Sequence, residues 1–330
     1  MESNEIEGWI PYKLTDVEGQ PMCHWLNTLD LAFAEPFFDS TIAKCRALDA
    51  NRNKFYSVSN LDAMAKWAGE TAEVSPIAFI FHISRCGSTL VSQLLASSPK
   101  NVSLAEVPFF DDILRLPFRY KEFNEAKING LLKAAIKYYS YKITAAEKPG
   151  EQKAERLFIK ADSWHIIFYE QLRRLFPEVP FILMYRSPDE VFRSHRKQAG
   201  MQAVPGLLEP EIFGFNQDVV NQDAQVYLAN ILAIYLEKYL EIAANDANCL
   251  LLNYSDGPMQ MINKIAAFAN IIFTEDELVN MDDRSQYHSK KPGERFSEAI
   301  VAGFPACLAN AMALYQILEE KKIGNAIIPN

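Results

Sequence analysis

Pro76–Leu95, PIAFIFHISRCGSTLVSQLL, is the stretch of sequence that decides the fold. Residues 77–81 form a nearly all-apolar run with the length and composition of a buried strand. A polar turn of small residues follows at 82–89, and apolar residues then recur at helical spacing over 90–95. A strand, a turn and a helix in this order point free backbone N–H groups and the positive end of the helix dipole at an anion. The stretch therefore predicts a phosphate-binding turn in an α/β protein.

The turn differs from the loop of ATPases and GTPases. Aligned on Gly87, the pattern G-x-x-x-x-G-K-[ST] requires glycine and lysine at the positions of His82 and Ser88. Arg85 supplies a cation two residues before the glycine instead. A guanidinium grips phosphate or sulfate through two hydrogen bonds and stays charged at any working pH. The alternative interpretation is an ordinary strand-to-helix turn with a surface arginine.

Length and composition are those of a globular protein with a full core. The chain has 330 residues, of which 49% are hydrophobic and 23% charged, enough for one large α/β domain with an appendage. The formal net charge of −9 argues against general nucleic-acid binding, although a local basic pocket for a small anion is compatible with it.

The sequence predicts a cytoplasmic protein with reduced thiols. Its N-terminus lacks the basic start and apolar run of a signal peptide, and no apolar stretch is long enough to span a bilayer. The cysteines have no C-x-x-C spacing, which favours neither a disulfide framework nor a zinc site. There are five of them: Cys23, Cys45, Cys86, Cys249 and Cys307.

Strands alternate with helices beyond the phosphate turn. Four further strands are predicted, at 101–107, 157–162, 180–185 and 249–253. Helices are predicted at 109–118, 128–141, 164–176, 189–197, 219–243, 258–268 and 297–320, with a basic loop at 284–295. This alternation predicts a three-layer fold over residues 76–330, a parallel sheet with helices on both faces.

Residues 1–75 are predicted to form a small appendage packed on the α/β domain. Apolar segments flank a turn at 16–21 and suggest a hairpin. Two helices are expected after it, one ending near Leu48 and one over 60–69. The sequence does not reveal the task of this segment.

Ligands in such folds bind at the carboxyl ends of the strands, so the residues there are the candidate site. These residues are Ser84, Arg85, Gly87, Ser88 and Thr89 after the first strand, Glu106 after the second, Lys160 and Asp162 after the third, and Arg186 and Ser187 after the fourth. Two arginines, a lysine and several hydroxyls suit a multiply charged phosphate ligand better than a metal. No His/Asp/Glu group has metal-ligand spacing, and H-E-x-x-H is absent.

Two motifs together resemble the sulfotransferase family, which uses 3′-phosphoadenosine 5′-phosphosulfate (PAPS). The first is Ser84–Thr89, similar to the family's P-[KR]-S-G-[ST]-T turn, and the second is Arg186–Ser194, similar to R-x-P-x-x-x-x-S. The resemblance covers residues 77–195, is fainter over 250–295 and is absent before 76. It implies that Ser84, Arg85, Cys86, Gly87, Ser88 and Thr89 bind the 5′-phosphosulfate. It also implies that Arg186 and Ser194 bind the 3′-phosphate.

The resemblance implies catalysis by positioning and by cationic stabilisation of the departing oxygen, with 3′,5′-ADP as product and no metal. Arg85 is the candidate for that stabilisation. Lys160 either assists at the transferring group or is a salt-bridged lysine at a strand end. Glu106 is the first candidate base, with a structural carboxylate as the alternative. His165 is the second, with a packed or capping histidine as the alternative.

The sequence departs from the family pattern at two positions of the turn. Ser84 replaces proline, and Cys86 replaces serine as either an oxidation-prone thiolate at a helix start or a small packing residue. The family's late basic loop corresponds to Lys290 and Lys291, unless these belong to an ordinary surface loop.

Two other functions remain open: a nucleotide-dependent kinase with a degenerate loop, for which Asp162 could hold Mg²⁺, and a catalytically silent binder of nucleotide or protein. The acceptor pocket is expected from the variable segments 109–119 and 200–215 and the N-terminal segment. Their aromatic residues suit a small apolar or aromatic alcohol, and they suit a protein core equally well: Phe109, Phe110, Phe118, Phe213 and Phe215. The oligomeric state is not predicted.

Overall fold

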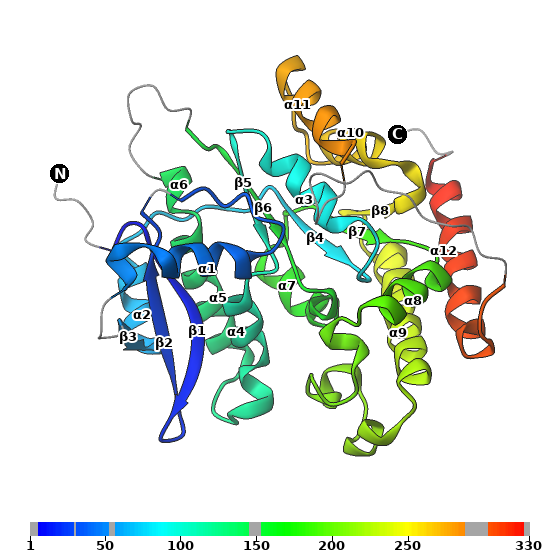
Figure 1. Cartoon of the computed structure of the whole chain (residues 1–330), viewed down its shortest axis with the longest axis horizontal. Coiled ribbons are helices and arrows are strands. Elements are labelled where there is room, and N and C mark those ends of the chain that lie inside the picture. The colour runs from blue at the N-terminus through cyan, green and yellow to red at the C-terminus, as the bar shows by residue number, and fades with distance from the viewer. Residues whose placement is uncertain (1–5, 30, 53–56, 145–152, 288–302, 327–330) are drawn as a thin grey trace.

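A computed structural model describes residues 6–29, 31–52, 57–144, 153–287 and 303–326 of the chain (Figure 1). Its centre is a sheet of five parallel strands in the order β5-β6-β4-β7-β8. The strands are β4 (Ala78–His82), β5 (Asn101–Ala105), β6 (Arg156–Lys160), β7 (Phe181–Tyr185) and β8 (Cys249–Asn253). The five predicted strands are confirmed, and the strand that leads into the phosphate turn is the central one.

Helices cover both faces of this sheet, which confirms the predicted three-layer architecture (Figure 1). One face carries α3 (Ser88–Ala96), α10 (Pro258–Phe268) and α11 (Glu275–Ser285), and the other carries α7 (Tyr169–Leu175) and α9 (Ala224–Asn245). Both α8 (Pro188–Lys197) and α12 (Ala309–Ala326) pack against α9. Among the helices that the structure describes, none combines the length and the apolar character needed to cross a membrane.

The central strands are buried on both sides. Every residue of β4, β5 and β7 is buried. Residues 78–81 of β4 and all of β7 are continuous apolar runs, as expected of strands covered on both faces, whereas β5 also buries Asn101 and Ser103. Their amide groups pair along the sheet, and the polar residues that follow each strand are brought to one edge. In the register of the sheet, Ile80 of β4 and Ala105 of β5 both lie opposite Lys160 of β6, and Tyr185 of β7 lies opposite Asn253 of β8. The strand ends are therefore level with one another.

The N-terminal segment forms a second, antiparallel sheet of three strands: β1 (Trp9–Val17), β2 (Gln20–Asn27) and β3 (Val58–Asn60). The predicted hairpin is confirmed, whereas β3 is too short to carry a sequence signal. Two helices accompany this sheet, α1 (Phe38–Ala47) and α2 (Leu61–Ala68).

Strand β1 packs against α4 (Pro108–Arg119) and α5 (Glu125–Tyr139) of the α/β unit. The backbone N–H of Leu14 donates to Asp112 at 2.8 Å, and the rings of Trp25 and Tyr138 meet edge to face with centroids 4.9 Å apart. These contacts join the N-terminal strands to the α/β unit through polar and aromatic pairs.

Three helix predictions are wrong at their ends. The predicted helix over 219–243 begins only at Ala224, because Asp223 accepts the N–H groups of Gln225 and Val226 as its cap. The predicted helix over 164–176 starts as a 3-10 helix, Ser163–Phe168. The predicted helix over 297–320 begins at Ala309, and Pro305 precedes a short 3-10 turn there. Residues 288–302 lie outside the described part of the chain.

Helix α11 was not predicted at all. Thr274 and Glu277 form a capping box at its start, with Thr274 accepting the N–H of Glu277 and Glu277 accepting the N–H of Thr274. The T-x-x-E spacing was the available signal, and the low apolar content of the segment obscured it.

Candidate active site

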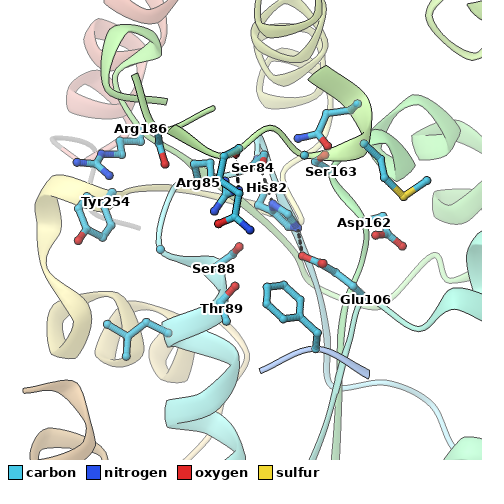
Figure 2. Close-up of a pocket in the computed structure, with 18 of the residues that line it drawn as sticks. His82, Ser84, Arg85, Ser88, Thr89, Glu106, Asp162, Ser163, Arg186 and Tyr254 are labelled. Atoms are coloured by element: carbon cyan, nitrogen blue, oxygen red, sulfur yellow. Dashed lines mark hydrogen bonds and ion pairs between the residues drawn. The ribbon is translucent and has the colours of Figure 1, made fainter. Parts of the chain in front are cut away.

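A cavity of about 620 Å³ lies at the carboxyl ends of the parallel strands (Figure 2). It is lined by nine of the residues predicted from the sequence: Ser84, Arg85, Gly87, Ser88, Thr89, Glu106, Asp162, Arg186 and Ser194. The predicted residues Cys86, Lys160 and His165 are not part of its lining. Lys290 and Lys291 lie outside the described residues, so their proposed part in binding stays a prediction.

The turn before α3 has the backbone geometry of an anion cradle. Ser84, Arg85 and Gly87 have φ values of +67°, +51° and +82°, all in the left-handed region. Successive backbone N–H groups of a turn form anion-binding concavities, and α3 with its own free N–H groups begins directly afterwards at Ser88. Left-handed conformations are costly for residues other than glycine and cluster at functional sites. The strained turn therefore supports the predicted anion site.

His82 explains why serine occupies the position that is proline in the family pattern. The backbone N–H of Ser84 donates to His82 Nδ1 at 3.0 Å, and proline has neither this N–H nor access to a φ of +67°. With Nδ1 accepting, the proton of the neutral ring is on Nε2, which lies 3.0 Å from the carbonyl oxygen of Ala161. Burial and the charge of Lys160 lower the pKa of His82, which favours this neutral form.

Cys86 is a packing residue. Its side chain is fully buried, with Sγ 3.4 Å from the carbonyl oxygen of Met184. Burial raises the pKa of the Cys86 thiol to about 11, so the alternative of a reactive thiolate is wrong. Any contribution of Cys86 to anion binding rests on its backbone.

Lys160 and Glu106 form an ion pair at the wall of the cavity. The Lys160 ammonium is fully buried and contacts Glu106 Oε1, and the same oxygen lies 3.1 Å from His82 Nε2. Burial by itself would raise the pKa of Glu106, but the charge of Lys160 and the hydrogen bond from His82 outweigh it and lower the pKa. Glu106 has a left-handed φ of +54°, and its N–H donates to the carbonyl oxygen of Lys160 at 2.8 Å. Glu106 is thus held ionised at the cavity wall.

Arg186 and Tyr254 occupy the other end of the cavity (Figure 2). The guanidinium carbon of Arg186 lies 4.4 Å from the centroid of the Tyr254 ring, and its Nε donates to Glu190 at 2.7 Å. Ser194, one helical turn after Glu190 in α8, also lines the cavity. The two motif residues that were predicted to bind one phosphate therefore face the same space.

Sequence reasoning missed Tyr254 and His82. Tyr254 directly follows β8, so extending the strand-end rule to the fifth strand would have found it. His82 was read as part of the turn, but it is the last residue of β4. Its Nε2 lies within hydrogen-bond distance of the carbonyl oxygen of Ala161, which is far along the sequence, and the sequence contains no local signal of this contact.

His165 has a structural role. It forms a capping box with Asp162, whose N–H donates to His165 Nδ1 at 3.2 Å, and its Nε2 donates to Asp111 at 3.1 Å. The His165 ring does not line the cavity. The interpretation of His165 as a capping histidine therefore agrees with the structure, and its interpretation as a catalytic base does not. Oxygen or nitrogen atoms of Asp111, Asp162 and His165 lie within 4.8 Å of one another, but Nε2 carries the proton in this arrangement and is no metal ligand.

The aromatic residues expected in the acceptor pocket belong instead to the core or to other surfaces. Phe109, Phe110 and Phe213 are buried, and neither these nor Phe118 and Phe215 line the cavity. The lining of the cavity also includes residues from four segments that the motifs do not cover: Phe37, Asp39, Pro108, Asp162, Trp164 and Met201. Trp164 belongs to the buried core and also lines the cavity. Its indole N–H donates to Asp111 at 2.6 Å.

Comparison with known proteins places the chain in a family. The model of the sulfotransferase family matches residues 76–275. The sulfotransferase STF9 from Mycobacterium avium has a similar structure, with a TM-score of 0.50 and 15% identity over 86% of this chain and 82% of its own. A sulfotransferase domain from the curacin biosynthetic pathway gives a TM-score of 0.48 and 16% identity over 75% of this chain and 99% of its own. No curated protein sequence matches the chain significantly. Because the family model spans more than half of the chain, the protein belongs to the sulfotransferase family.

Proposed function

We propose that this protein transfers the sulfuryl group of PAPS to a hydroxyl or amine of an acceptor and releases 3′,5′-ADP. One observation supports the proposal: the two motifs predicted to bind anions, the Arg85 turn and the Arg186–Ser194 pair, line one cavity. A donor with phosphate groups at both ends of its ribose needs such a pair of sites. Membership of the family supports the same activity.

In the proposed arrangement the donor fills the part of the cavity between the turn before α3 and Arg186, which we call the nucleotide half. Ser88, Thr89 and the N–H groups of the turn, including that of Cys86, would hold the 5′-phosphosulfate at the start of α3. Arg186 and Ser194 would grip the 3′-phosphate, which distinguishes PAPS from simpler adenylates. Sulfuryl transfer needs no metal in this scheme, because Arg85 supplies the positive charge.

The chemistry is an in-line displacement at sulfur. The acceptor oxygen or nitrogen forms a bond to sulfur, the bond from sulfur to the 5′-phosphate oxygen breaks, and that oxygen keeps the electron pair. Arg85 lies in the strained turn and stabilises the charge that develops there. Glu106 accepts the acceptor's proton, since it is ionised and lines the cavity. Lys160 positions Glu106 through their ion pair.

The first prediction concerns Arg85. Replacing Arg85 with alanine should lower kcat by about 10²–10³-fold, because it removes the guanidinium that we propose stabilises the departing oxygen. The binding of 3′,5′-ADP should change much less, since the product lacks the sulfuryl group. The measurement is transfer of label from radiolabelled PAPS to a panel of hydroxyl and amine compounds, with calorimetry of 3′,5′-ADP beside it.

Arg174→Ala is the matched control, because Arg174 lies on α7 in an exposed ion pair with Glu125. It should transfer label at the wild-type rate. Equal rates in Arg85→Ala and wild type would remove Arg85 from the mechanism. Binding of PAPS without any transfer would favour the silent binder, and transfer of phosphate from Mg-ATP would favour the kinase.

A further inference from the structure

Charge is divided along the cavity. Within the described part of the chain, the lysine and arginine side chains of the lining are Arg85 and Arg186, both in the proposed nucleotide half. The carboxylates of the lining are Asp39, Glu106, Asp111 and Asp162. Figure 2 shows Arg186 at one end and Glu106 with Asp162 at the other. The donor end is thus cationic and the acceptor end is acidic.

Two of the four carboxylates have their charge balanced by the protein. Glu106 is paired with Lys160. Asp111 accepts from Arg115 at 2.8 Å as well as from Trp164 and His165. Their negative charge is therefore already compensated before any ligand enters.

The other two carboxylates have no cationic partner among the described lysines and arginines. Asp162 accepts the N–H of His165 in its capping box and lies 3.7 Å from the Nε2 of that ring, which donates to Asp111 instead. Asp39 lies in the first turn of α1 without an ion pair in the described residues. Burial and the charge of Glu106 raise the pKa of both, with Asp111 and Asp39 adding to the effect on Asp162 and Lys160 opposing it. Asp39 and Asp162 are therefore carboxylates whose charge no described lysine or arginine pairs with.

Two aromatic rings, each two residues from one of these carboxylates in the sequence, also line the cavity. Phe37 and Trp164 both line the cavity, and the Lys160 ammonium already lies 5.7 Å from the centroid of the Phe37 ring. Ring faces attract cations, so Phe37 and Trp164 suit a positively charged group in the cavity. Phe37 and Asp39 come from the N-terminal segment, whose task the sequence left open.

We propose that the acceptor carries a positively charged amine beside its reacting group, and that Asp39 and Asp162 hold this amine between them. The N-terminal segment then forms part of the acceptor site and selects acceptors by charge. This inference rests on the proposed function, and it replaces the expectation of a purely apolar or aromatic alcohol.

Three phenols of nearly equal size and different charge test the proposal: tyramine, 4-ethylphenol and 4-hydroxyphenylacetate. Calorimetry would measure their binding to the full chain with and without saturating 3′,5′-ADP. The wild type should bind tyramine about tenfold more tightly than 4-ethylphenol, as expected for one partly buried ion pair, and the anion most weakly. Asp39→Asn keeps the shape of the side chain and should bring tyramine close to 4-ethylphenol.

Asp62→Asn is the matched control, because Asp62 lies on α2 of the same N-terminal segment, exposed and outside the cavity lining. It should retain the wild-type preference. Equal binding of the three phenols, preference for the anion, no binding up to their solubility, or an unchanged preference in Asp39→Asn would each overturn the inference. If tyramine is preferred but 3′,5′-ADP does not bind, the charge selection stands and the proposed donor fails.

Discussion

Replacing Lys160 with methionine should lower the free energy of unfolding by about 3–5 kcal/mol at neutral pH, the usual cost of leaving one member of a buried ion pair alone. The Lys160 side chain is fully buried and its ammonium contacts Glu106, so the substitution leaves the largely buried Glu106 carboxylate at the cavity wall without its cation. Urea denaturation of the wild type and the variant measures the difference. Sulfuryl transfer should fall as well, because Glu106 loses its fixed position.

The pH dependence of this loss identifies its cause. In the wild type the pKa of Glu106 is depressed, so its contribution to stability is present above the ordinary glutamate pKa of 4.5 and is lost as the pH falls. In the variant the pKa of Glu106 is depressed less, because the charge of Lys160 no longer opposes the effect of burial, so protonation of the carboxyl relieves part of the cost of the substitution. The deficit of the variant should therefore shrink below pH 4.5. Lys160→Met combined with Glu106→Gln should recover much of the stability at neutral pH without activity. A deficit that is independent of pH and is not recovered would show that Lys160 acts by packing alone.

Replacing Gly87 with alanine should lower the free energy of unfolding by about 2–3 kcal/mol and weaken the binding of 3′,5′-ADP. Gly87 has a φ of +82°, which costs other residues about 1–2 kcal/mol. A Cβ there would lie 2.5 Å and 2.7 Å from two atoms of the Tyr254 ring, which stacks on Arg186. The ring must move, and Arg186 with it. Thermal denaturation and calorimetry measure the two effects.

Gly130→Ala provides the control for Gly87. Gly130 lies within α5, and a Cβ added there meets no atom within 4 Å. Alanine is the better helix former by about 1 kcal/mol, so this variant should be as stable as the wild type or more stable, with unchanged nucleotide binding. If Gly87→Ala behaved like Gly130→Ala, neither the strain of the turn nor its contact with Tyr254 would matter.

The sequence was sufficient for the sheet and for the nucleotide half of the site. Most of the buried parallel strands are apolar runs, and the residues after them reach one edge of the sheet by topology, which is why Arg85 and Arg186 could be placed together, with Glu106 from the acceptor end beside them. Helix ends were less predictable, because capping by Asp223 and Thr274 decided them over the apolar pattern.

The acceptor half could not be predicted, because it depends on contacts between distant segments. Phe37 and Asp39 reach the cavity only because β1 packs against α4 and α5, and no local pattern encodes that docking. The pairing of His82 with Ser84 was hidden for a related reason. Ser84 stands where the family pattern has proline, and its N–H donates to His82 Nδ1, a hydrogen bond that forms only in the folded turn. The sequence also showed carboxylates at the strand ends without showing which of them Lys160 and Arg115 neutralise.

The most direct test of the central claim is a calorimetric titration of 3′,5′-ADP, 5′-AMP and Mg-ATP into the wild type, Arg186→Ala and Arg193→Ala. Arg193 lies on the same helix as Ser194, pairs with Asp189 and does not line the cavity, so it serves as control. We expect the wild type and Arg193→Ala to bind 3′,5′-ADP at least about tenfold more tightly than 5′-AMP, the value of one charge-assisted pair of hydrogen bonds. Arg186→Ala should lose this preference. Binding of 3′,5′-ADP no tighter than that of 5′-AMP in the wild type would contradict the assignment of the 3′-phosphate site and, with it, PAPS as the donor.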